Sequence, residues 1–276
     1  MKRILTVQDI SCVGKCSLTV ALPIISAMGV ECAILPTAVL SAHTAFPGFT
    51  FRDLTEDLGG IIAHWRDVGI DFEAVYTGYL GSQEQMDIVA HLFDTYGDAI
   101  RIVDPVMGDN GRLYPGFTEE FAKKMAQLCA KADIILPNMT EAAYMLGIPY
   151  VGDGYDEAYI KNLLRRLAAL GPKVAILTGV CLEEGRLGAM AYDRENNAFF
   201  YYGREHLPGS FHGTGDVFAS AFTGALTEGG DWREALRVAT DYTVECIAMT
   251  LANPNHVTYG VEFERAIPYL TRRIGK

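Results

Sequence analysis

Short apolar runs alternate along this sequence with longer segments in which apolar residues recur at helical spacing, and this alternation constrains the fold most. The runs short enough for buried strands are Ile4–Val7, Cys32–Leu35, Ala74–Tyr76, Ile100–Val103, Ile134–Leu136 and Val174–Leu177. The helical segments between them are Leu18–Met28, Arg52–Val68, Gln83–Phe93, Glu119–Ala130 and Glu157–Ala169. This alternation predicts an α/β fold with a mainly parallel central sheet.

The alternation changes in the last third of the chain. Two runs, Leu187–Tyr192 and Ala198–Tyr202, flank a polar turn and predict a hairpin. Helical spacing then returns in three segments near Asp216–Leu226, Trp232–Thr250 and Val261–Arg273. No low-complexity linker or internal repeat marks a boundary, so the sequence predicts a single domain over residues 1–276.

Polar residues with chemical potential gather directly after the predicted strands. In an open α/β sheet, ligands bind beyond the carboxyl ends of the strands. The positions concerned are Asp9, Ser11, Ser41–Thr44, Thr77–Tyr79, Asp104–Asp109, Asn138–Glu141 and Thr178-Gly179. Their placement predicts a small-molecule site at this edge of the sheet.

The segment Gly213-Thr214-Gly215-Asp216 precedes an apolar helical stretch and carries the sharpest chemical signal. Two glycines allow a tight turn, and the free N–H groups at a helix N-terminus can receive an anion. Asp216 itself has two interpretations, because aspartate is also a preferred helix cap. The carboxylates elsewhere in the chain favour the chemical one.

Two further segments offer oxygen ligands suited to Mg²⁺ and phosphates. Asp104 and Asp109 lie on a loop tightened by proline and glycine, and Asn138 and Glu141 open the helix after the next strand. Each segment alone also fits an ordinary turn or a capped helix. Together with Asp216 they indicate phosphoryl transfer, in which the protein positions the groups and neutralises charge.

These motifs, in this order, resemble those of the ribokinase-like superfamily. Within it, Ser41-Ala42-His43-Thr44 is similar to the S-N-H-T stretch of pyridoxal kinases, and Thr77–Ser82 with Glu84-Gln85 is similar to their T-G-Y-L-G-S-x-E-Q segment. The resemblance spans nearly the whole chain. It implies a three-layer fold with helices on both faces of the sheet, a homodimer, and ATP-dependent phosphorylation of the 5′-hydroxymethyl group of pyridoxal, pyridoxine or pyridoxamine.

The resemblance also implies roles for particular residues. Asp216 would accept the proton of the substrate hydroxyl, and the anion hole would come from Gly213, Thr214 and Gly215. The B6 vitamer would contact Ser11, Thr44, Tyr79 and Asp216. ATP would be bound by Asp104, Asp109, Asn138, Thr178, Gly179, Gly213 and Gly215. Mg²⁺ would be held by Asp109 and Glu141, and a monovalent cation stays an open alternative.

The sequence departs from the family pattern after the first strand. There the alignment leaves two candidates for one pocket residue, Asp9 and Ser11. Related kinases of hydroxymethylpyrimidine usually have cysteine where this chain has Asp216, which favours a B6 vitamer. The alternatives are a hydroxymethylpyrimidine or sugar kinase of the same fold, and a sensor that binds a vitamer or nucleotide without turnover.

Net charge and cysteine content restrict the possible binding partners and the possible cellular compartment. A formal net charge of −11 disfavours binding to nucleic acid or to an anionic membrane. The cysteines are scattered, with no C-x-x-C pair, which disfavours zinc and is typical of reduced thiols in a cytoplasmic protein. No signal peptide or membrane span is expected.

Overall fold

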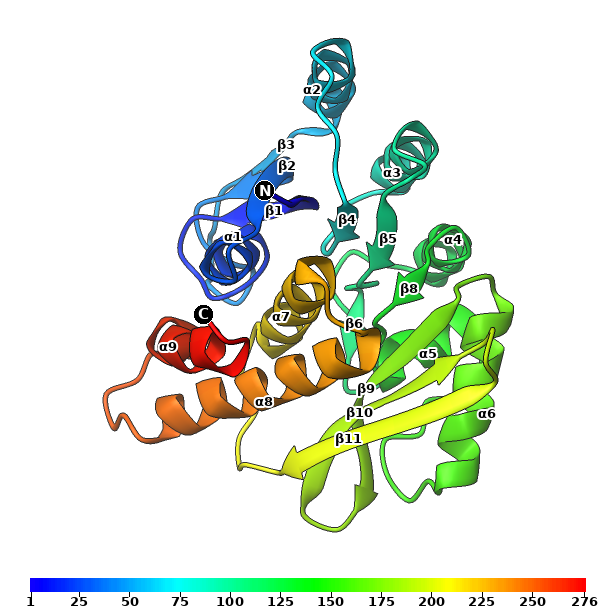
Figure 1. The fold of residues 1–276 in the computed structure, drawn as a ribbon, viewed down its shortest axis with the longest axis vertical. Coiled ribbons are helices and arrows are strands. Elements are labelled where there is room, and N and C mark those ends of the chain that lie inside the picture. Colours follow the sequence, from blue (N-terminus) through cyan, green and yellow to red (C-terminus); the bar gives the residue numbers. More distant parts are fainter. The chain divides into compact units, whose positions relative to one another are not determined.

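Parallel strands joined by helices dominate the computed structural model, which describes all residues 1–276. The chain divides into two compact units. The first comprises Met1–Tyr76 and Arg204–Lys276, and the second comprises Thr77–Gly203. Figure 1 identifies the elements of each. The single domain expected from the sequence stays a prediction.

The strands of the first unit have the neighbour order β4-β1-β2-β3. β1 and β2 pair in parallel, and β3 pairs antiparallel with β2. Both long strands extend well beyond the apolar runs that predicted them, because polar residues such as Gln8 and Thr37 continue the strands while buried. The bounds are β1 Arg3–Ser11, β2 Glu31–Leu40, β3 Phe51–Asp53 and β4 Ala74–Thr77.

Among the helices of the first unit, α8 packs against α7 and α9, and α7 also packs against α1. Small residues on α7 permit the close approach: a Cβ added at Gly224 would lie 2.5 Å from the sulfur of Met28. Figure 1 shows α8 as the long orange helix beside the red α9. The bounds are α1 Leu18–Ala27, α2 Thr55–Asp67, α7 Thr214–Glu228, α8 Trp232–Leu251 and α9 Phe263–Arg273.

The strands of the second unit have the order β11-β10-β9-β8-β5, and a short ribbon is formed by β6 and β7. β5, β8 and β9 run parallel, whereas β10 pairs antiparallel with β9. The strands are β5 Ile100–Val103, β6 Gly108–Asp109, β7 Arg112–Leu113, β8 Ile134–Ile135, β9 Val174–Glu183, β10 Arg186–Asp193 and β11 Ala198–Glu205. The helices are α3 Gln83–Thr95, α4 Glu119–Cys129, α5 Met139–Leu146 and α6 Glu157–Ala169.

The turn between β10 and β11 confirms the predicted hairpin. The carboxylate of Asp193 accepts the backbone N–H of Asn196 at 3.1 Å and its side-chain amide at 2.8 Å. Asn197 then adopts a left-handed conformation with φ 47°, which asparagine tolerates better than most residues. Side chains as well as the backbone therefore stabilise this polar turn.

Two local predictions were wrong or incomplete. Helix α2 begins at Thr55 and not at Arg52, because Phe51–Asp53 pairs with the end of β2 as β3. The side chain of Asp53 accepts the backbone N–H of Thr55 at 2.7 Å where the helix starts. The β6–β7 ribbon was not predicted, since strands of two residues leave no periodic signal. The predicted α/β class, with a mainly parallel sheet and flanking helices, is confirmed.

Candidate active site

Asp216 lies in the first turn of α7, directly after a left-handed glycine. Gly213 has φ 77° and occupies the N-cap position. A Cβ at this position would overlap the backbone oxygen of Lys15, so only glycine fits. The first intrahelical bond runs from Val217 N–H to Gly213 C=O, which leaves the N–H groups before it without an intrahelical acceptor. This is the geometry that the G-T-G-D motif predicts.

The carboxyl group of Asp216 is difficult to ionise in this environment. Burial raises its pKa from 3.8 to about 7. The backbone N–H of Ser17 donates a hydrogen bond to the carboxylate and lowers the pKa, whereas the negative charge of Asp9 raises it. A carboxyl group with a pKa near neutrality can accept a proton efficiently at physiological pH. Asp216 therefore has the properties of a general base.

Asp9 and Ser11, the two candidates for one pocket position, are hydrogen-bonded to each other. The hydroxyl of Ser11 donates to Oδ2 of Asp9 at 2.9 Å, and both residues are buried, 2% and 4% exposed for Ser11 and Asp9. Burial raises the pKa of Asp9, while hydrogen bonds from the side chains of Ser17 and Ser11 lower it. The two residues thus form one polar cluster at the end of β1.

The loop that precedes α7 carries His212, whose ring lies near that of His43, and His43 in turn lies near Tyr259. The ring of His43 lies 5.5 Å from the ring of His212 and 6.2 Å from that of Tyr259. Nδ1 of His43 accepts the backbone N–H of Ala45 at 3.1 Å. Burial and the neighbouring His212 lower the pKa of His43, so its ring is neutral at pH 7. Thr44, the predicted vitamer contact beside His43, is exposed.

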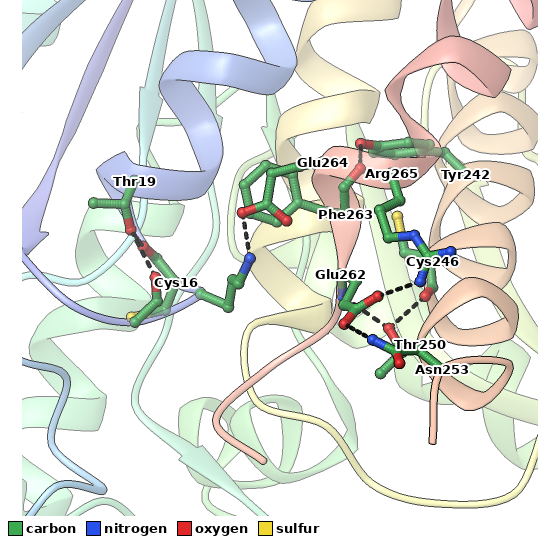
Figure 2. Close-up of polar contacts among 12 residues, drawn as sticks. Cys16, Thr19, Tyr242, Cys246, Thr250, Asn253, Glu262, Phe263, Glu264 and Arg265 are labelled. Atoms are coloured by element: carbon green, nitrogen blue, oxygen red, sulfur yellow. Dashed lines mark hydrogen bonds and ion pairs between the residues drawn. The ribbon is translucent and has the colours of Figure 1, made fainter. Parts of the chain in front are cut away.

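The loop between α8 and α9, which carries Tyr259, is held by hydrogen bonds to Glu262 (Figure 2). The backbone N–H of Glu262 donates to Oγ1 of Thr250 at 2.7 Å. Its carboxylate accepts from the side chains of Asn253 at 2.6 Å and Arg265 at 2.8 Å. These bonds fix the path of the loop and with it the position of Tyr259.

In the second unit, Glu141 joins helix α5 to the loop after β5. One oxygen accepts the backbone N–H of Met107 at 3.1 Å and the other that of Asn138 at 2.8 Å. Burial raises the pKa of Glu141 to about 8; the two N–H donors lower it, and the nearby charge of Asp109 raises it. A cation near these two carboxylates would relieve their repulsion.

The remaining residues of this unit that are predicted to bind ATP lie around Asn138. Its side chain accepts the backbone N–H of Glu141 at 2.9 Å and donates to the backbone oxygen of Gly108 at 2.9 Å. Asn138 also forms a β-bridge with Thr178. Asp109 is exposed next to Gly108, and Asp104 is buried at the end of β5. The contacts of Glu141 and Asn138 therefore gather these loop ends around the start of α5.

Replacing Asn138 with alanine is expected to lower the free energy of unfolding by about 1–2 kcal/mol, because the capping box of α5 loses one of its two bonds. Urea denaturation measures this difference. Ser82→Ala, which removes the side-chain cap of α3, provides a matched control for an ordinary cap. An equal loss in both variants would mean that the bond from Asn138 to Gly108 contributes nothing beyond capping.

Tyr79 and Gly179 complete the predicted set. Tyr79 is half-buried, with its ring 5.6 Å from the ring of Phe117. Gly179 is exposed and has φ 72°, a conformation that favours glycine.

No group of three or more histidine, cysteine or acidic side chains is arranged to hold a metal ion. None of the helices combines the length and the apolar character that a membrane span requires.

Sequence reasoning missed Ser17, a buried residue that lowers the pKa of Asp216 and of Asp9. No motif points to it, because a serine before a helix is interpreted as an ordinary cap. Asp9 gave a clearer signal, since an acidic residue that follows an apolar strand is costly to bury without a purpose.

The chain matches known proteins in both sequence and fold. The model of the phosphomethylpyrimidine kinase family matches residues 25–261. A candidate phosphomethylpyrimidine kinase from Bacteroides thetaiotaomicron, whose crystal structure contains pyridoxal, is 41% identical, with a TM-score of 0.91 over 98% of this chain and 95% of that one. Pyridoxal kinase from Lactobacillus plantarum is 32% identical, with a TM-score of 0.91 over 99% and 97%.

A further pyridoxal kinase is similar to this chain in sequence. A pyridoxal kinase of Granulibacter bethesdensis is 28% identical over 249 residues, which are 86% of this chain and 85% of that protein. The family model and these relatives each span most of the chain. This chain therefore belongs to the family of phosphomethylpyrimidine and pyridoxal kinases, with the ribokinase-like fold.

Proposed function

We propose that this protein transfers the γ-phosphoryl group of ATP to the 5′-hydroxymethyl group of pyridoxal, pyridoxine or pyridoxamine. The observation that carries the proposal is Asp216, a carboxyl group with a pKa of about 7 at the start of a glycine-turned helix. The pyridoxal kinases among the relatives support the acceptor, and membership of a kinase family supports ATP as the donor. The enzyme is thus a phosphotransferase with an alcohol group as acceptor.

In this reaction Asp216 accepts the proton of the attacking hydroxyl. Phosphoryl transfer passes through a loose transition state, so the proton leaves late and an aspartate is a sufficient base. The backbone N–H groups of Gly213, Thr214 and Gly215 stabilise negative charge on the transferring group. The hydroxyl of Thr214 is held by the backbone oxygen of Phe211 at 3.2 Å, which fixes the first turn of the helix.

The residues of the second unit fit a nucleotide with its divalent ion. Mg²⁺ in kinases is held by one or two carboxylates together with phosphates and water, and this mode needs no all-protein cage. Asp109 and Glu141 supply two carboxylates whose mutual repulsion a cation would offset. When bound, Mg²⁺ would neutralise phosphate charge there. Asp104, Asn138, Thr178 and Gly179 would contact ATP.

Asp109→Asn is expected to raise the Mg²⁺ concentration for half-maximal activity by about 10-fold or more, since one carboxylate ligand is lost. Stabilisation of the protein by ADP should likewise need more Mg²⁺ in thermal melts. Asp153→Asn, an exposed acidic residue of the same unit, is the control and should change neither quantity. An unchanged Mg²⁺ requirement in Asp109→Asn would remove this residue from the metal site.

The pH dependence of kcat is expected to show an acid limb near pH 7, because Asp216 acts only when ionised. Asp9→Asn removes a negative charge that raises the pKa of Asp216, so the limb should move to lower pH by about half a unit or more. Initial rates from pH 5 to 9 at saturating substrate measure the shift. A limb that moves to higher pH would contradict this electrostatic assignment.

For the vitamer we propose contacts to Ser11, Thr44 and Tyr79, as the family resemblance implies. The protein acts as a homodimer in this proposal. A cytoplasmic location is supported by six cysteines that are all free, as expected in a reducing compartment. A dimeric mass in light scattering would agree with the proposed assembly.

Hydroxymethylpyrimidine is the second candidate acceptor, because the matching family is that of the phosphomethylpyrimidine kinases, which are named for a substrate with a pyrimidine ring. A panel of alcohols, assayed by ADP release with and without Mg²⁺, separates the candidates. We expect the highest kcat/KM for a B6 vitamer. A higher value for hydroxymethylpyrimidine or a sugar would transfer the assignment to that acceptor. Binding of ATP and vitamer in calorimetry without turnover of any alcohol would indicate a sensor.

A further inference from the structure

The β6–β7 ribbon, which carries Asp109, is too short to keep its shape by itself. Each strand has two residues, and the turn Asn110-Gly111 joins them. Asn110 and Gly111 have φ values of 50° and 75°, and a type I′ hairpin turn requires two such positive angles. A two-stranded hairpin is only marginally stable in water, so contacts outside the ribbon must hold it.

Helix α5 supplies these contacts, mostly from its N-terminus. The hydroxyl oxygen of Thr140 accepts the backbone N–H of Gly111 at 2.9 Å. The side-chain amide of Asn138 donates to the backbone oxygen of Gly108 at 2.9 Å. The hydroxyl of Tyr144 donates a longer bond, 3.4 Å, to the backbone oxygen of Gly111. The start of β6 and the turn are therefore bonded to the same helix.

Tyr150, in the segment after α5, packs against the same turn. A Cβ added at Gly111 would lie 2.7 Å from the ring of Tyr150, so the ring rests on bare backbone. This contact and the positive φ together favour glycine at position 111. The turn is thus held by packing as well as by hydrogen bonds.

The turn also orients the carboxylate of Asp109. Oδ1 of Asp109 accepts the backbone N–H of Asn110 at 2.8 Å, and Oδ2 accepts the side-chain amide of Asn110 at 3.1 Å. These two bonds tie the carboxylate to the turn, so a displaced turn would carry the carboxylate with it. The other carboxylate proposed to hold Mg²⁺ belongs to Glu141, which follows Thr140 directly on α5.

The hydroxyl of Thr140 is not needed to cap α5. Asn138 is the N-cap residue and forms the capping box with Glu141. Thr140 is 1% exposed, and a buried hydroxyl costs free energy unless it is hydrogen-bonded. The bond from Gly111 offsets this cost, so the side chain is suited to holding the turn.

We propose that Thr140 is a positioning residue, whose hydroxyl holds the Asn110-Gly111 turn on α5 and thereby keeps the carboxylate of Asp109 near that of Glu141. The inference rests on the proposed function, in which these two carboxylates hold Mg²⁺. Thr140 acts through Asp109 and supplies no ligand of its own to the ion.

Two substitutions separate the hydroxyl of Thr140 from the rest of its side chain. Thr140→Val has nearly the same shape but cannot accept the N–H of Gly111, whereas Thr140→Ser keeps the hydroxyl. Thr95→Val is the matched control, because the hydroxyl of Thr95 bonds to its own helix α3 in the same unit. Thermal melts identify folded variants, and Thr140→Ala replaces the valine variant if that one fails to fold.

Hydrogen exchange of the Gly111 amide, followed by NMR without nucleotide or metal, measures the bond directly. The exchange rate should rise by about 10-fold or more in Thr140→Val, because the N–H loses its acceptor. Thr140→Ser and Thr95→Val should keep the wild-type rate. An unchanged rate in Thr140→Val would mean that the hydroxyl does not hold the turn, and the inference would fail.

Thermal melts with ADP measure the consequence for the divalent ion. The Mg²⁺ concentration for half-maximal stabilisation by ADP should rise by about 5-fold or more in Thr140→Val and return to the wild-type value in Thr140→Ser. KM for the vitamer should stay within about 2-fold. A purely structural role would instead lower the melting temperature at every Mg²⁺ concentration without moving the half-maximal point.

Two results of these melts would overturn the inference, and they are distinguishable. Thr140→Val, or Thr140→Ala in its place, could keep the wild-type Mg²⁺ requirement while Asp109→Asn raises it. The metal site would then stand, and the positioning role would fail. Alternatively, Asp109→Asn could leave the Mg²⁺ requirement unchanged. The proposed metal ligand would then fail, and the role of Thr140 with it.

Discussion

Replacing Asp216 with asparagine is expected to lower kcat by about 10²–10⁴-fold, because the amide cannot accept the proton of the attacking hydroxyl. The two side chains have nearly the same shape, and KM for ATP and vitamer should therefore change little. A loss in kcat and in kcat/KM together identifies an interaction made in the transition state. Steady-state kinetics at saturating ATP and Mg²⁺ measure both quantities.

The same substitution should leave the protein folded and make it more stable at neutral and alkaline pH. The folded pKa of Asp216 is raised from 3.8 to about 7, so its contribution to stability is fully present below pH 3.8 and is lost as the pH rises to about 7. Asp216→Asn has no charge to bury and should melt at a higher temperature than wild type at pH 8. The difference should vanish below pH 4.

Glu228→Gln, at the opposite end of α7, is the matched control because it removes a carboxylate from the same helix far along its length from Asp216. Its kcat should equal that of wild type. If Asp216→Asn keeps near-normal kcat, or if both variants lose turnover equally, Asp216 does not serve as the base.

Gly213→Ala is expected to cost about 2 kcal/mol or more of stability and to lower kcat by at least about 10-fold. Its added Cβ would overlap the backbone oxygen of Lys15, and the native φ of 77° is unfavourable for alanine. Relief of the overlap requires the loop at residues 12–17 or the start of α7 to move. Movement at the start of α7 displaces Asp216, which lies in the first turn of this helix.

Gly215→Ala provides the control for stability, since a Cβ there would meet no atom within 4 Å. Its free energy of unfolding in urea should stay within about 1 kcal/mol of wild type. If Gly213→Ala is as stable as Gly215→Ala, the close approach of Lys15 to Gly213 does not restrict this position.

The overall class of the fold could be predicted from the sequence because it depends on periodicity. Leu18, Gln83, Glu119, Glu157 and Trp232 begin helices where the pattern places them. Helical spacing and short apolar runs report which faces are buried, and burial determines these elements. The missed strand β3 has three exposed residues, so it leaves no such pattern.

The chemistry of Asp216 could be predicted only in part. Its place at a helix N-terminus follows from Gly213-Thr214-Gly215, because glycines and the helix period are local features. Its raised pKa depends on burial and on Asp9, which is distant in the sequence. Such long-range electrostatic effects arise from the packing of separate elements and have no local signature.

Ser17 and Glu141 each have a structural feature that the sequence alone does not predict. Glu141 was predicted as a metal ligand, and the structure adds that both its oxygens accept backbone N–H groups. The positive φ of Ser17 was not predicted, because serine rarely adopts this conformation. Backbone conformation at a loop end is set by its tertiary contacts, as those of Lys15 and Gly14 show.

Identification of the product formed from ATP and pyridoxal tests the proposed kinase activity most directly. After incubation of the purified protein with both substrates and Mg²⁺, ³¹P NMR and mass spectrometry should show one phosphate ester on the hydroxymethyl oxygen and one ADP per ester. ADP release without a phosphorylated vitamer, or no reaction with any B6 vitamer, would contradict it.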